Sequence, residues 1–477
     1  MKQQAFNPYL PSWEYIPDGE PRAFGDRVYV YGSHDRFNAP IFCVKDYVCW
    51  SAPVDDLSDW RYEGIIYRKN QDPRNKMGLR LLFAPDVVRG VDGRYYLYYA
   101  FDFMGITGVA VCDTPAGQYE FYGYVHYADG TIWGRRKGDQ FPFDPGVLVD
   151  DDGRIWHYSG FYTPTPAIVT GGIPLKNEGG VVMELEQDMV TIKTEPKVIF
   201  PKEGPGSFEN HEFFEASSIR KDGERYIFVY SSRHNHELCY AVSHRPDGDF
   251  VFGGTLVSLG DLFLDGRTEE KHGLNYLGNT HGGMLNIGDD WYIFYHRQTN
   301  RHSYSRQACA EKLVRTADGR FLQAEVTSCG LNGGPLKGQG RYEARIACNL
   351  WSKDGVGRYD GSAPRKRLKD HPYFTQGGQK GKQYIANMRD GSVAGFKYFE
   401  FRDLSQVCIT VGGRGAGVMQ ISTEPQFTVL CGEISISADG SRRAFRAACH
   451  IPNGTHPLYF RYCGSGAIDF CDFVLNG

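Results

Sequence analysis

The sequence predicts an all-β protein: a five-bladed β-propeller followed by a β-sandwich (jelly-roll) domain. The chain combines 58 Gly with 14% aromatic residues, and few of its segments have a helical pattern. One strand motif recurs five times in the first two-thirds of the chain. The last third contains many short strand segments at close spacing.

The recurring motif is a turn of Gly and Asp followed by a strand rich in Tyr, Trp and Ile. Its copies are GDRVYVYGS from Gly25, DGRYYLYYA from Asp92, DGRIWHYSG from Asp152, DGERYIFVYSS from Asp222 and GDDWYIFYHR from Gly288. The turn aspartates are residues 26, 92, 152, 222 and 289, so successive copies are 66, 60, 70 and 67 residues apart. Five such repeats indicate five blades of about four antiparallel strands each. We expect the propeller to span residues 1–325.

Each copy follows a strand-like segment that holds one ionisable residue. The five residues are Asp18, Asp86, Asp144, Glu215 and His281. Because the first strand of each propeller blade lines the central axis, these side chains are expected to meet at one end of the tunnel. A single such acid is more often a turn or cap residue. Several of them lie beside aromatic residues, where desolvation raises a carboxyl pKa, and the set therefore favours a functional site.

Several carboxylates in an aromatic-rich site suit glycoside hydrolysis. One protonated acid donates to the leaving oxygen, and a second carboxylate either deprotonates water or attacks as the nucleophile. A third carboxylate near the acid would keep it protonated by like-charge repulsion. Opposite walls of a propeller tunnel would allow the separation of roughly 6.5–9.5 Å that inverting enzymes use.

Composition limits the partners. A net charge of -4 over 477 residues argues against a nucleic-acid partner, and no apolar run approaches the roughly 20 residues of a membrane span. The N-terminal segment MKQQAFNPYLPSWEY lacks signal-peptide features, so a cytoplasmic location is expected unless the sequence has been trimmed. The 12 Cys show no CxxC pair and are expected to be buried free thiols. The oligomeric state is not defined by the sequence.

Two short motifs carry no expected ligand. The HNHE run at residues 234–237 lacks the helical context of a metal motif and is interpreted as a loop. The GRGAG run at residues 413–417 lacks a strand–loop–helix unit and is not a nucleotide-binding loop. Residues 326–477, with strand segments such as FKYFEF, QVCITVGG and EISISADG, are expected to form the β-sandwich.

Six motifs in order resemble glycoside hydrolase family 43. They are NPYLPSWEYIPDGEP, SAPVDDLSDW, FAPD, FDPGVLVDDDGRIW, FFEASSIRKDGERYIF and NTHGGM, and the resemblance runs through about residue 325. The resemblance implies a five-bladed propeller with inverting activity of the arabinofuranosidase, xylosidase or arabinanase kind. The segment from GGRGAGVMQIS to THPLYFRYCGSGAIDFCDFVL resembles a family 6 carbohydrate-binding module in its framework strands. Paired aromatic residues that stack on sugar are not evident there, so a structural or dimerising role is an equal alternative.

The resemblance implies roles for individual residues. Asp18 is the expected general base, Asp144 the aspartate that modulates the pKa of the acid, and Glu215 the general acid. Glu215-Ala216-Ser217 stands where the family usually has Glu-Gly-Pro or Glu-Ala-Pro, and Asp18-Gly19 stands where it usually has Asp-Pro. His281 resembles a histidine near an axial calcium in many members, which implies Ca²⁺ as a candidate cofactor.

The remaining candidate residues are expected to contact the sugar. Aromatic rings near the proposed acids could wall a small pocket, Asp86 is expected to be structural or to face the substrate, and an arginine after Tyr295-His296 resembles one that reaches the site from the fifth blade. This substrate-binding set is Trp13, Phe37, Phe83, Asp86, Phe214 and Arg297.

We therefore expect an inverting exo-glycosidase that removes terminal α-L-arabinofuranosyl or β-D-xylosyl residues from plant-derived oligosaccharides. Two alternatives remain: an endo-arabinanase with an open groove, and a non-catalytic sugar-binding propeller. Arabinose and xylose present similar hydroxyl geometry, and the sequence does not separate them.

Overall fold

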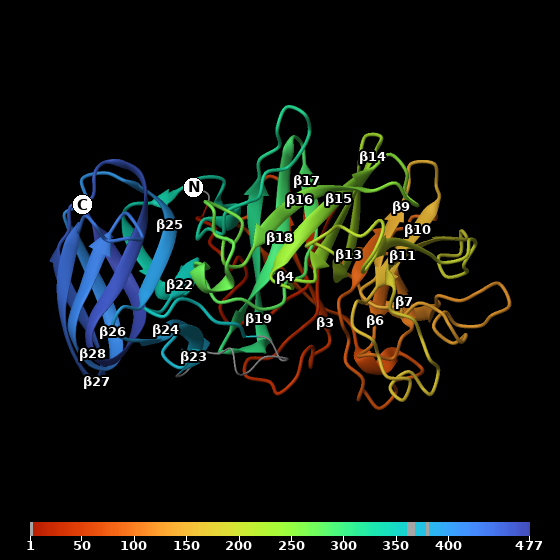
Figure 1. Ribbon diagram of the computed structural model, residues 1–477, viewed down its shortest axis with the longest axis horizontal. Coiled ribbons are helices and arrows are strands. Elements are labelled where there is room, and N and C mark those ends of the chain that lie inside the picture. The colour runs from red at the N-terminus through yellow and green to blue at the C-terminus, as the bar shows by residue number, and fades with distance from the viewer. Residues whose placement is uncertain (1–2, 360–367, 378–380) are drawn as a thin grey trace.

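The computed structural model describes residues 3–359, 368–377 and 381–477. Nearly all of its regular structure is β-strand, and Figure 1 shows the chain as a propeller beside a strand-rich C-terminal domain. Only four single 3-10 turns interrupt the strands in the described part: η1 (Lys69–Gln71), η2 (Glu270–His272), η3 (Gly330–Asn332) and η4 (Ala344–Ile346). None of the described helices is long and apolar enough to cross a membrane.

Five separate antiparallel sheets follow one another along the chain, as the repeat predicts. The first holds β1 (Glu20–Phe24), β2 (Arg27–Tyr31), β3 (Tyr47–Pro53) and β4 (Arg61–Tyr67). The second holds β5 (Asp86–Arg89), β6 (Tyr95–Ala100), β7 (Thr107–Cys112) and β8 (Glu120–Tyr124). The third holds β9 (Gly146–Val149), β10 (Ile155–Gly160), β11 (Gly179–Leu185) and β12 (Lys197–Pro201).

The fourth sheet holds β13 (Phe213–Asp222), β14 (Arg225–Ser232), β15 (Glu237–Ser243) and β16 (Val251–Ser258). The fifth holds β17 (Met284–Ile287), β18 (Asp290–Thr299) and β19 (His302–Leu313), so its described part has three strands where about four are expected. The five-bladed propeller is therefore confirmed.

The sequence repeat corresponds to the hairpin that joins the first two strands of each blade. In the first blade Phe24 pairs with Arg27, which leaves Gly25 and Asp26 as a two-residue turn. Gly25 has φ +63°, a conformation that glycine adopts without strain and that tight hairpins require. The aromatic strand after this turn lies in the middle of its sheet, where both faces are buried.

The first strand of each blade faces the axis. Around the axis, β17 contacts β1, β1 contacts β5, β5 contacts β9 and β9 contacts β13, and a parallel bridge between Gly19 and Gly282 joins the first blade to the fifth. This arrangement brings residues that are far apart in the sequence to the same end of the tunnel.

A layer of buried ion pairs fills the tunnel beside the first strands. Arg22 contacts both carboxylate oxygens of Asp86, at 3.0 and 2.5 Å. Arg220 contacts Oε1 of Glu20 at 2.5 Å, and Oγ of Ser218 donates to the same oxygen at 2.9 Å. The two carboxylates are almost fully buried and the two arginine side chains are only 11 and 12% exposed, so each charge needs the partner it has. We call Glu20, Arg22, Asp86 and Arg220 the ionic layer.

The C-terminal domain is built on a nine-stranded sheet. It comprises β20 (Leu336–Lys337), β21 (Gly340–Glu343), β22 (Asn349–Trp351), β23 (Tyr373–Gly377), β24 (Lys382–Met388), β25 (Val393–Phe401), β26 (Gln406–Ser422), β27 (Gly432–Ala448) and β28 (Gly454–Asn476). Its apolar core holds Phe396, Phe460, Phe470 and Phe473. The GRGAG run lies within β26, in agreement with its exclusion as a nucleotide-binding loop. The domain boundary after residue 325 stays a prediction.

Candidate active site

One cavity of about 380 Å³ opens at the axis and holds four of the five predicted axis residues. Asp18, Asp144, Glu215 and His281 line it, and each comes from a different blade. The other lining residues are Phe42, Phe83, Phe103, Phe143, Phe161, Phe214, Asn235, Asn279, Ser303, Tyr304 and Arg306. The site therefore combines three carboxylates and two basic groups with an aromatic wall.

Asp18 lies two residues before β1, in a left-handed backbone conformation with φ +57°. Its backbone N–H donates to Nδ1 of His296 at 3.2 Å, and Nη1 of Arg306 donates to its Oδ1 at 2.9 Å. Burial raises the pKa of Asp18, while Arg306 and His281 oppose that rise. Burial, Arg306 and His281 lower the pKa of His296 well below its ordinary value, so this ring is neutral and can accept the hydrogen bond.

Arg306 is a site residue that the sequence reasoning missed. It lies in β19 and forms a two-pronged contact with Asp35, with Nε–Oδ2 at 2.9 Å and Nη2–Oδ1 at 3.1 Å. Asp35 is fully buried, and the Arg306 guanidinium also lies over the Phe42 ring, 4.7 Å from its centroid. Asp35 therefore fixes the guanidinium that contacts Asp18. The available sequence signal was an arginine in the strand that follows the fifth copy of the repeat.

Asp144 and His281 form a second contact in the cavity. Nδ1 of His281 lies 3.4 Å from Oδ2 of Asp144, and the backbone N–H of Ala216 donates to the same oxygen at 3.2 Å. Asp144 also has a left-handed backbone, with φ +47°. Burial would lower the pKa of His281, but Asp144, Asp18 and Glu215 outweigh it and raise this pKa to about 9. His281 is therefore a cation at neutral pH.

Glu215 differs from the other two acids because no salt bridge or hydrogen bond to its carboxylate is recorded among the described residues. The pairing of β13 with β14 shifts register on both sides of Glu215, and the next residue, Ala216, has φ +71°. Such bulges re-aim a side chain at the edge of a site. Burial raises the pKa of Glu215 well above its ordinary value, and the charges of Asp144 and Asp18 raise it further.

Phenylalanine rings form the wall beside the acids. Phe143 packs against Phe161 at 4.8 Å between ring centroids, and Phe83 and Phe103 contact Phe143 at 5.7 and 5.8 Å. Phe214 packs against Phe161 at 5.6 Å. The predicted residues Phe83 and Phe214 therefore line the cavity, together with five rings that were not predicted. This wall presents apolar faces and lowers the local polarity around the acids.

Four predicted substrate contacts lie elsewhere. Trp13 is 53% exposed and packs against Trp50, and Phe37 packs against Tyr15. Neither ring lines the cavity. Asp86 belongs to the ionic layer, where Arg22 occupies both of its oxygens, so of its two predicted roles the structural one holds.

The predicted position of Arg297 is wrong. Its guanidinium donates to the backbone carbonyls of Ala347 and Arg345 at 2.9 and 2.7 Å and stacks on Phe374 at 3.8 Å. These partners belong to the C-terminal domain, so Arg297 joins the two domains. Arg306 is the arginine that reaches the cavity.

The acids of the cavity do not by themselves form the oxygen shell of a calcium ion. Ca²⁺ takes about six to eight oxygen ligands. His281 contributes nitrogen and contacts Asp144, while Asp18 contacts Arg306 and the acids of the ionic layer contact Arg22 and Arg220. In the described part of the chain, the one group of three or more potential metal ligands with mutually close donor atoms lies outside this cavity.

The arrangement is suited to general acid–base chemistry. It holds one carboxyl group with a strongly raised pKa, one carboxylate contacted by a guanidinium and one carboxylate contacted by a protonated imidazole. Carboxyl groups whose surroundings separate their pKa values can divide the acid and base roles between them.

The sequence was compared with known protein families and with characterised proteins. Residues 17–321, which include all five axis residues, match the family "Glycosyl hydrolases family 43". A "Xylosidase/arabinosidase" of Thermoclostridium stercorarium is 49% identical and aligns with 100% of this chain and 99% of its own length. A protein of the same description from Bacteroides ovatus is 28% identical over 66% of this chain and 97% of its own.

Solved structures share the fold. A family 43 arabinoxylan arabinofuranohydrolase from Bacillus subtilis, in complex with cellotetraose, covers 98% of this chain and 96% of its own at 20% identity and a TM-score of 0.51. A β-xylosidase/α-arabinofuranosidase from a compost microbial metagenome, in complex with xylotriose and described as a calcium-free form, has a TM-score of 0.53 at 23% identity. It covers 68% of this chain and 98% of its own.

Proposed function

The chain belongs to glycosyl hydrolase family 43, and from this premise we propose that it is an inverting exo-glycosidase acting on terminal α-L-arabinofuranosyl or β-D-xylosyl residues of oligosaccharides. The name of the 49%-identical relative, a xylosidase/arabinosidase, supports this pair of sugars. Two solved neighbours were obtained with cellotetraose and xylotriose, which supports an oligosaccharide substrate.

Glu215 is proposed as the general acid, and its environment is the observation that carries the proposal. Burial, Asp144 and Asp18 all raise its pKa, so it keeps a proton at a pH where an ordinary glutamate has lost it. In the reaction this proton passes to the glycosidic oxygen as the bond from that oxygen to the anomeric carbon breaks.

Asp18 is proposed as the general base. Arg306 and His281 stabilise its negative charge against the effect of burial. The carboxylate takes a proton from water while the water oxygen bonds to the anomeric carbon, opposite the departing oxygen. The contacts of Asp18 with His296 and Arg306 hold it in place for this step.

Asp144 is proposed to modulate the acid. Its charge is one of the causes that raise the pKa of Glu215, and its contact with His281 holds it beside that acid. The backbone N–H of Ala216, the residue after Glu215, donates to Asp144 and ties the two acids together.

The size of the cavity supports exo action. At about 380 Å³ it lies near the small end of the ~300–1,000 Å³ range of ligand pockets. A cavity of this size holds a terminal sugar, and the aromatic wall offers apolar ring faces to it. The substrate-contacting set we propose is Phe83, Phe214, Phe143 and Arg306.

The proposed mechanism includes no step through calcium, because two of the three cavity carboxylates already contact cationic side chains. Calorimetry with Ca²⁺ and EDTA-treated protein tests for calcium held through water ligands near His281. A cytoplasmic location remains a proposal, supported by 12 cysteines that all lack disulfide bonds.

Glu215→Gln tests the acid assignment with two kinds of leaving group. Nitrophenolate departs with little help from an acid, whereas a sugar alcohol needs a proton. We therefore expect the variant to lose roughly 10²–10⁴-fold in kcat/KM on xylo- and arabino-oligosaccharides, and far less on nitrophenyl glycosides. The exposed Glu224→Gln, in the turn after β13, is the matched control and should keep both activities.

Equal losses on both substrates would contradict the acid role of Glu215. The anomeric form of the first sugar released, followed by proton NMR, tests inversion independently. Retention of configuration would require a carboxylate nucleophile and would overturn the role of Asp18. If the wild-type protein hydrolyses neither class of glycoside, the enzyme proposal itself fails.

A further inference from the structure

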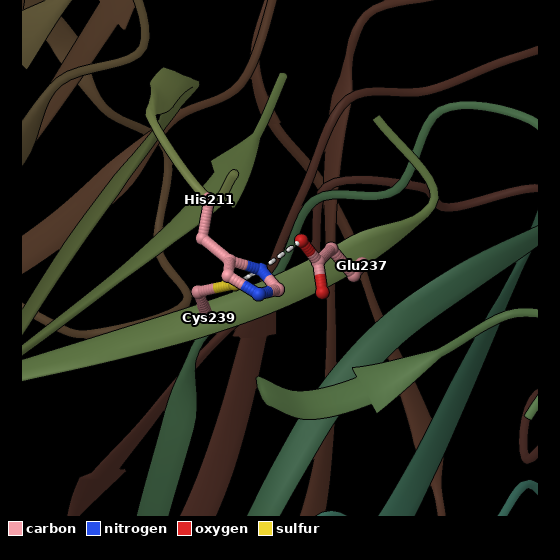
Figure 2. Close-up of side chains that lie close together, drawn as sticks. All are labelled: His211, Glu237 and Cys239. Atoms are coloured by element: carbon pink, nitrogen blue, oxygen red, sulfur yellow. Dashed lines mark hydrogen bonds and ion pairs between the residues drawn. The ribbon is translucent and has the colours of Figure 1, made fainter. Parts of the chain in front are cut away.

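A second group of reactive side chains lies in the fourth blade, outside the catalytic cavity. His211 precedes β13, Glu237 begins β15, and Cys239 follows two residues later. Figure 2 shows the three side chains pointing toward one another, and their potential ligand atoms all lie within 4.8 Å of each other. The HNHE run is a turn through residue 236, as predicted, but its last residue, Glu237, belongs to this group. We call His211, Glu237 and Cys239 the HEC cluster.

The distances are close to those of a metal shell. Nδ1 of His211 lies 2.7 Å from Oε1 of Glu237 and 3.8 Å from Sγ of Cys239. Residues two apart on a strand point to the same face, which explains why Glu237 and Cys239 meet. A tetrahedral zinc with Zn–N near 2.0 Å and Zn–S near 2.3 Å sets its ligand atoms roughly 3.3–3.8 Å apart. The histidine–glutamate contact would therefore lengthen by about half an ångström on binding.

The surroundings of the HEC cluster orient its ligands. Oγ of Ser232 donates to Oε1 of Glu237 at 2.5 Å, and Oγ1 of Thr255 donates to Oε2 at 2.8 Å. The His211 ring stacks on Phe252 at 4.9 Å and contacts Phe263 at 5.6 Å. Outer hydrogen bonds and an apolar shell of this kind hold the ligands of metal sites in place.

We propose that the HEC cluster is a binding site for a divalent transition-metal ion, with Zn²⁺ as the expected ion. Nitrogen, sulfur and one carboxylate oxygen form a donor set that suits zinc and does not suit calcium or magnesium. Binding replaces the histidine–glutamate hydrogen bond with two metal–ligand bonds; the proton on Nδ1 of His211 moves to solvent or, as the tautomer changes, to Nε2, and the thiol proton of Cys239 is released to solvent. Thiolate and carboxylate then balance the charge of the ion.

The metal ion can reach the HEC cluster from solvent, and a fourth ligand is available. Cys239 and Glu237 are buried, but the His211 side chain is 21% exposed and leaves a path from solvent. The ring of His234, which is half-buried, lies 5.9 Å from that of His211 and is the nearest further imidazole. Either His234 or water completes a four-coordinate shell.

A simpler structure accounts for part of these contacts. His211, Ser232 and Thr255 already satisfy the Glu237 carboxylate by hydrogen bonds. That network needs no sulfur, and within the described residues the hydrogen-bond contacts of Cys239 with His211 and Thr255 are long, at 3.8 and 3.9 Å. Bonding of the Cys239 sulfur to an added metal ion therefore distinguishes a metal site from a purely hydrogen-bonded cluster.

The HEC cluster is connected to the catalytic cavity. Ser232 and Glu237 flank the turn that carries Asn235, which lines the cavity with φ +65°. The backbone N–H of Asn235 donates to Ser232, and its carbonyl accepts from Thr280, the neighbour of His281. A metal ion at the HEC cluster would hold the base of this turn, and with it Asn235. This consequence rests on the proposed function, whereas metal binding does not.

Cobalt(II) titration of the full chain after chelator treatment tests the site. We expect one equivalent to bind, with visible absorption of a tetrahedral ion and a near-ultraviolet sulfur-to-cobalt band, both removed by Zn²⁺. Cys239→Ser should remove the sulfur band, and His211→Gln should lower the affinity at least tenfold. The matched control is Cys309→Ser, a buried thiol in β19, which should leave the spectrum unchanged.

The absence of a stoichiometric cobalt spectrum in the wild-type protein overturns the proposal, as does a sulfur band that persists in Cys239→Ser. If Cys239→Ser does not fold, His211→Gln and the thermal unfolding of the wild-type protein decide. Zn²⁺ should raise Tm and a chelator should reverse the rise, and no change in Tm contradicts the site. Hydrolysis of oligosaccharides with and without Zn²⁺ then tests the link to Asn235 separately from the catalytic assignment.

Discussion

Two neighbouring layers of buried charge on the propeller axis have different chemistry. In the ionic layer, Arg22 contacts both oxygens of Asp86, and Arg220 and Ser218 contact Glu20. In the catalytic cavity, three carboxylates share His281 and one guanidinium, and that guanidinium is also held by Asp35. The local excess of carboxyl groups leaves Glu215 without a cation of its own. Charge balance, rather than residue type, therefore separates a structural acid from a reactive one.

The largest expected effect is on Asp18. Asp18→Asn removes the proposed base and should lower kcat by roughly 10³–10⁴-fold on every substrate, including nitrophenyl glycosides. The backbone contact with His296 remains and Arg306 keeps its two-pronged contact with Asp35, so Tm should fall less than in a variant that removes the main partner of a buried arginine. Steady-state kinetics and thermal unfolding measure both. The turn variant Asp26→Asn is the control, and a similar loss there would show that the effect is not specific to the cavity.

In the ionic layer, a substitution should lower stability and leave kcat unchanged. Asp86→Asn leaves Arg22 buried without its full partner, which is expected to cost about 3–5 kcal/mol of unfolding free energy. The kcat of the protein that remains folded should not change. Asp92→Asn, at a partly exposed pair with Arg94 in the same blade, should cost about 1 kcal/mol or less. A catalytic defect with an unchanged Tm in Asp86→Asn would assign Asp86 to the active site after all.

Asp35 is a structural acid that acts on the catalytic cavity, because it holds Arg306, the arginine that contacts Asp18. Asp35→Asn should let the Arg306 guanidinium shift and lower kcat by about 10²-fold, with a smaller change in KM. Arg297→Gln is the contrasting variant: its guanidinium contacts the C-terminal domain, so Tm should fall while kcat is kept. If Arg297→Gln lowers kcat and Asp35→Asn does not, the assignment of the two arginines is reversed.

The smallest expected effect is that of Asp144→Asn on the pH dependence of kcat/KM. Activity on oligosaccharides should fall as pH rises through the raised pKa of Glu215, since only its protonated form can act as the acid. Asp144→Asn removes one negative charge that raises this pKa, so the alkaline limb of the kcat/KM profile should move to lower pH. Burial remains as the first cause, so the shift should be partial. An unchanged or alkaline-shifted limb would show that Asp144 does not modulate Glu215.

The sequence could predict which residues approach the propeller axis, because the pattern that marks them is local and is repeated in each blade. Each blade repeats a Gly-Asp hairpin before an aromatic strand, and each ionisable residue lies at a nearly constant distance before that hairpin. The propeller, the positions of Asp18, Asp144, Glu215 and His281, and two of the wall residues, Phe83 and Phe214, follow from this pattern. The roles of these residues in catalysis remain proposals.

The choice between two arginines could not be made in this way. Arg297 in β18 pairs with Gln307 in β19, so these two side chains share one face of the sheet. Arg306 is the residue before Gln307 and points to the other face, where Asp18 and Asp35 lie. A sequence pattern that names the fifth blade does not show which face of its sheet meets the cavity and which meets the C-terminal domain.

The sequence by itself therefore determined the blade count and which residues approach the axis, because strand periodicity and turn chemistry are local properties. Only the tertiary structure decided which of those charges are balanced. Arg22, which contacts Asp86, and Arg306, which contacts Asp18, lie 64 and 288 residues from their partners along the chain. The same holds for His211 and Cys239, which meet only after the loop before β13 packs against β15. The role of a carboxyl group depends on the partners that folding brings to it. Those partners lie far away along the chain, so a local sequence pattern does not identify them.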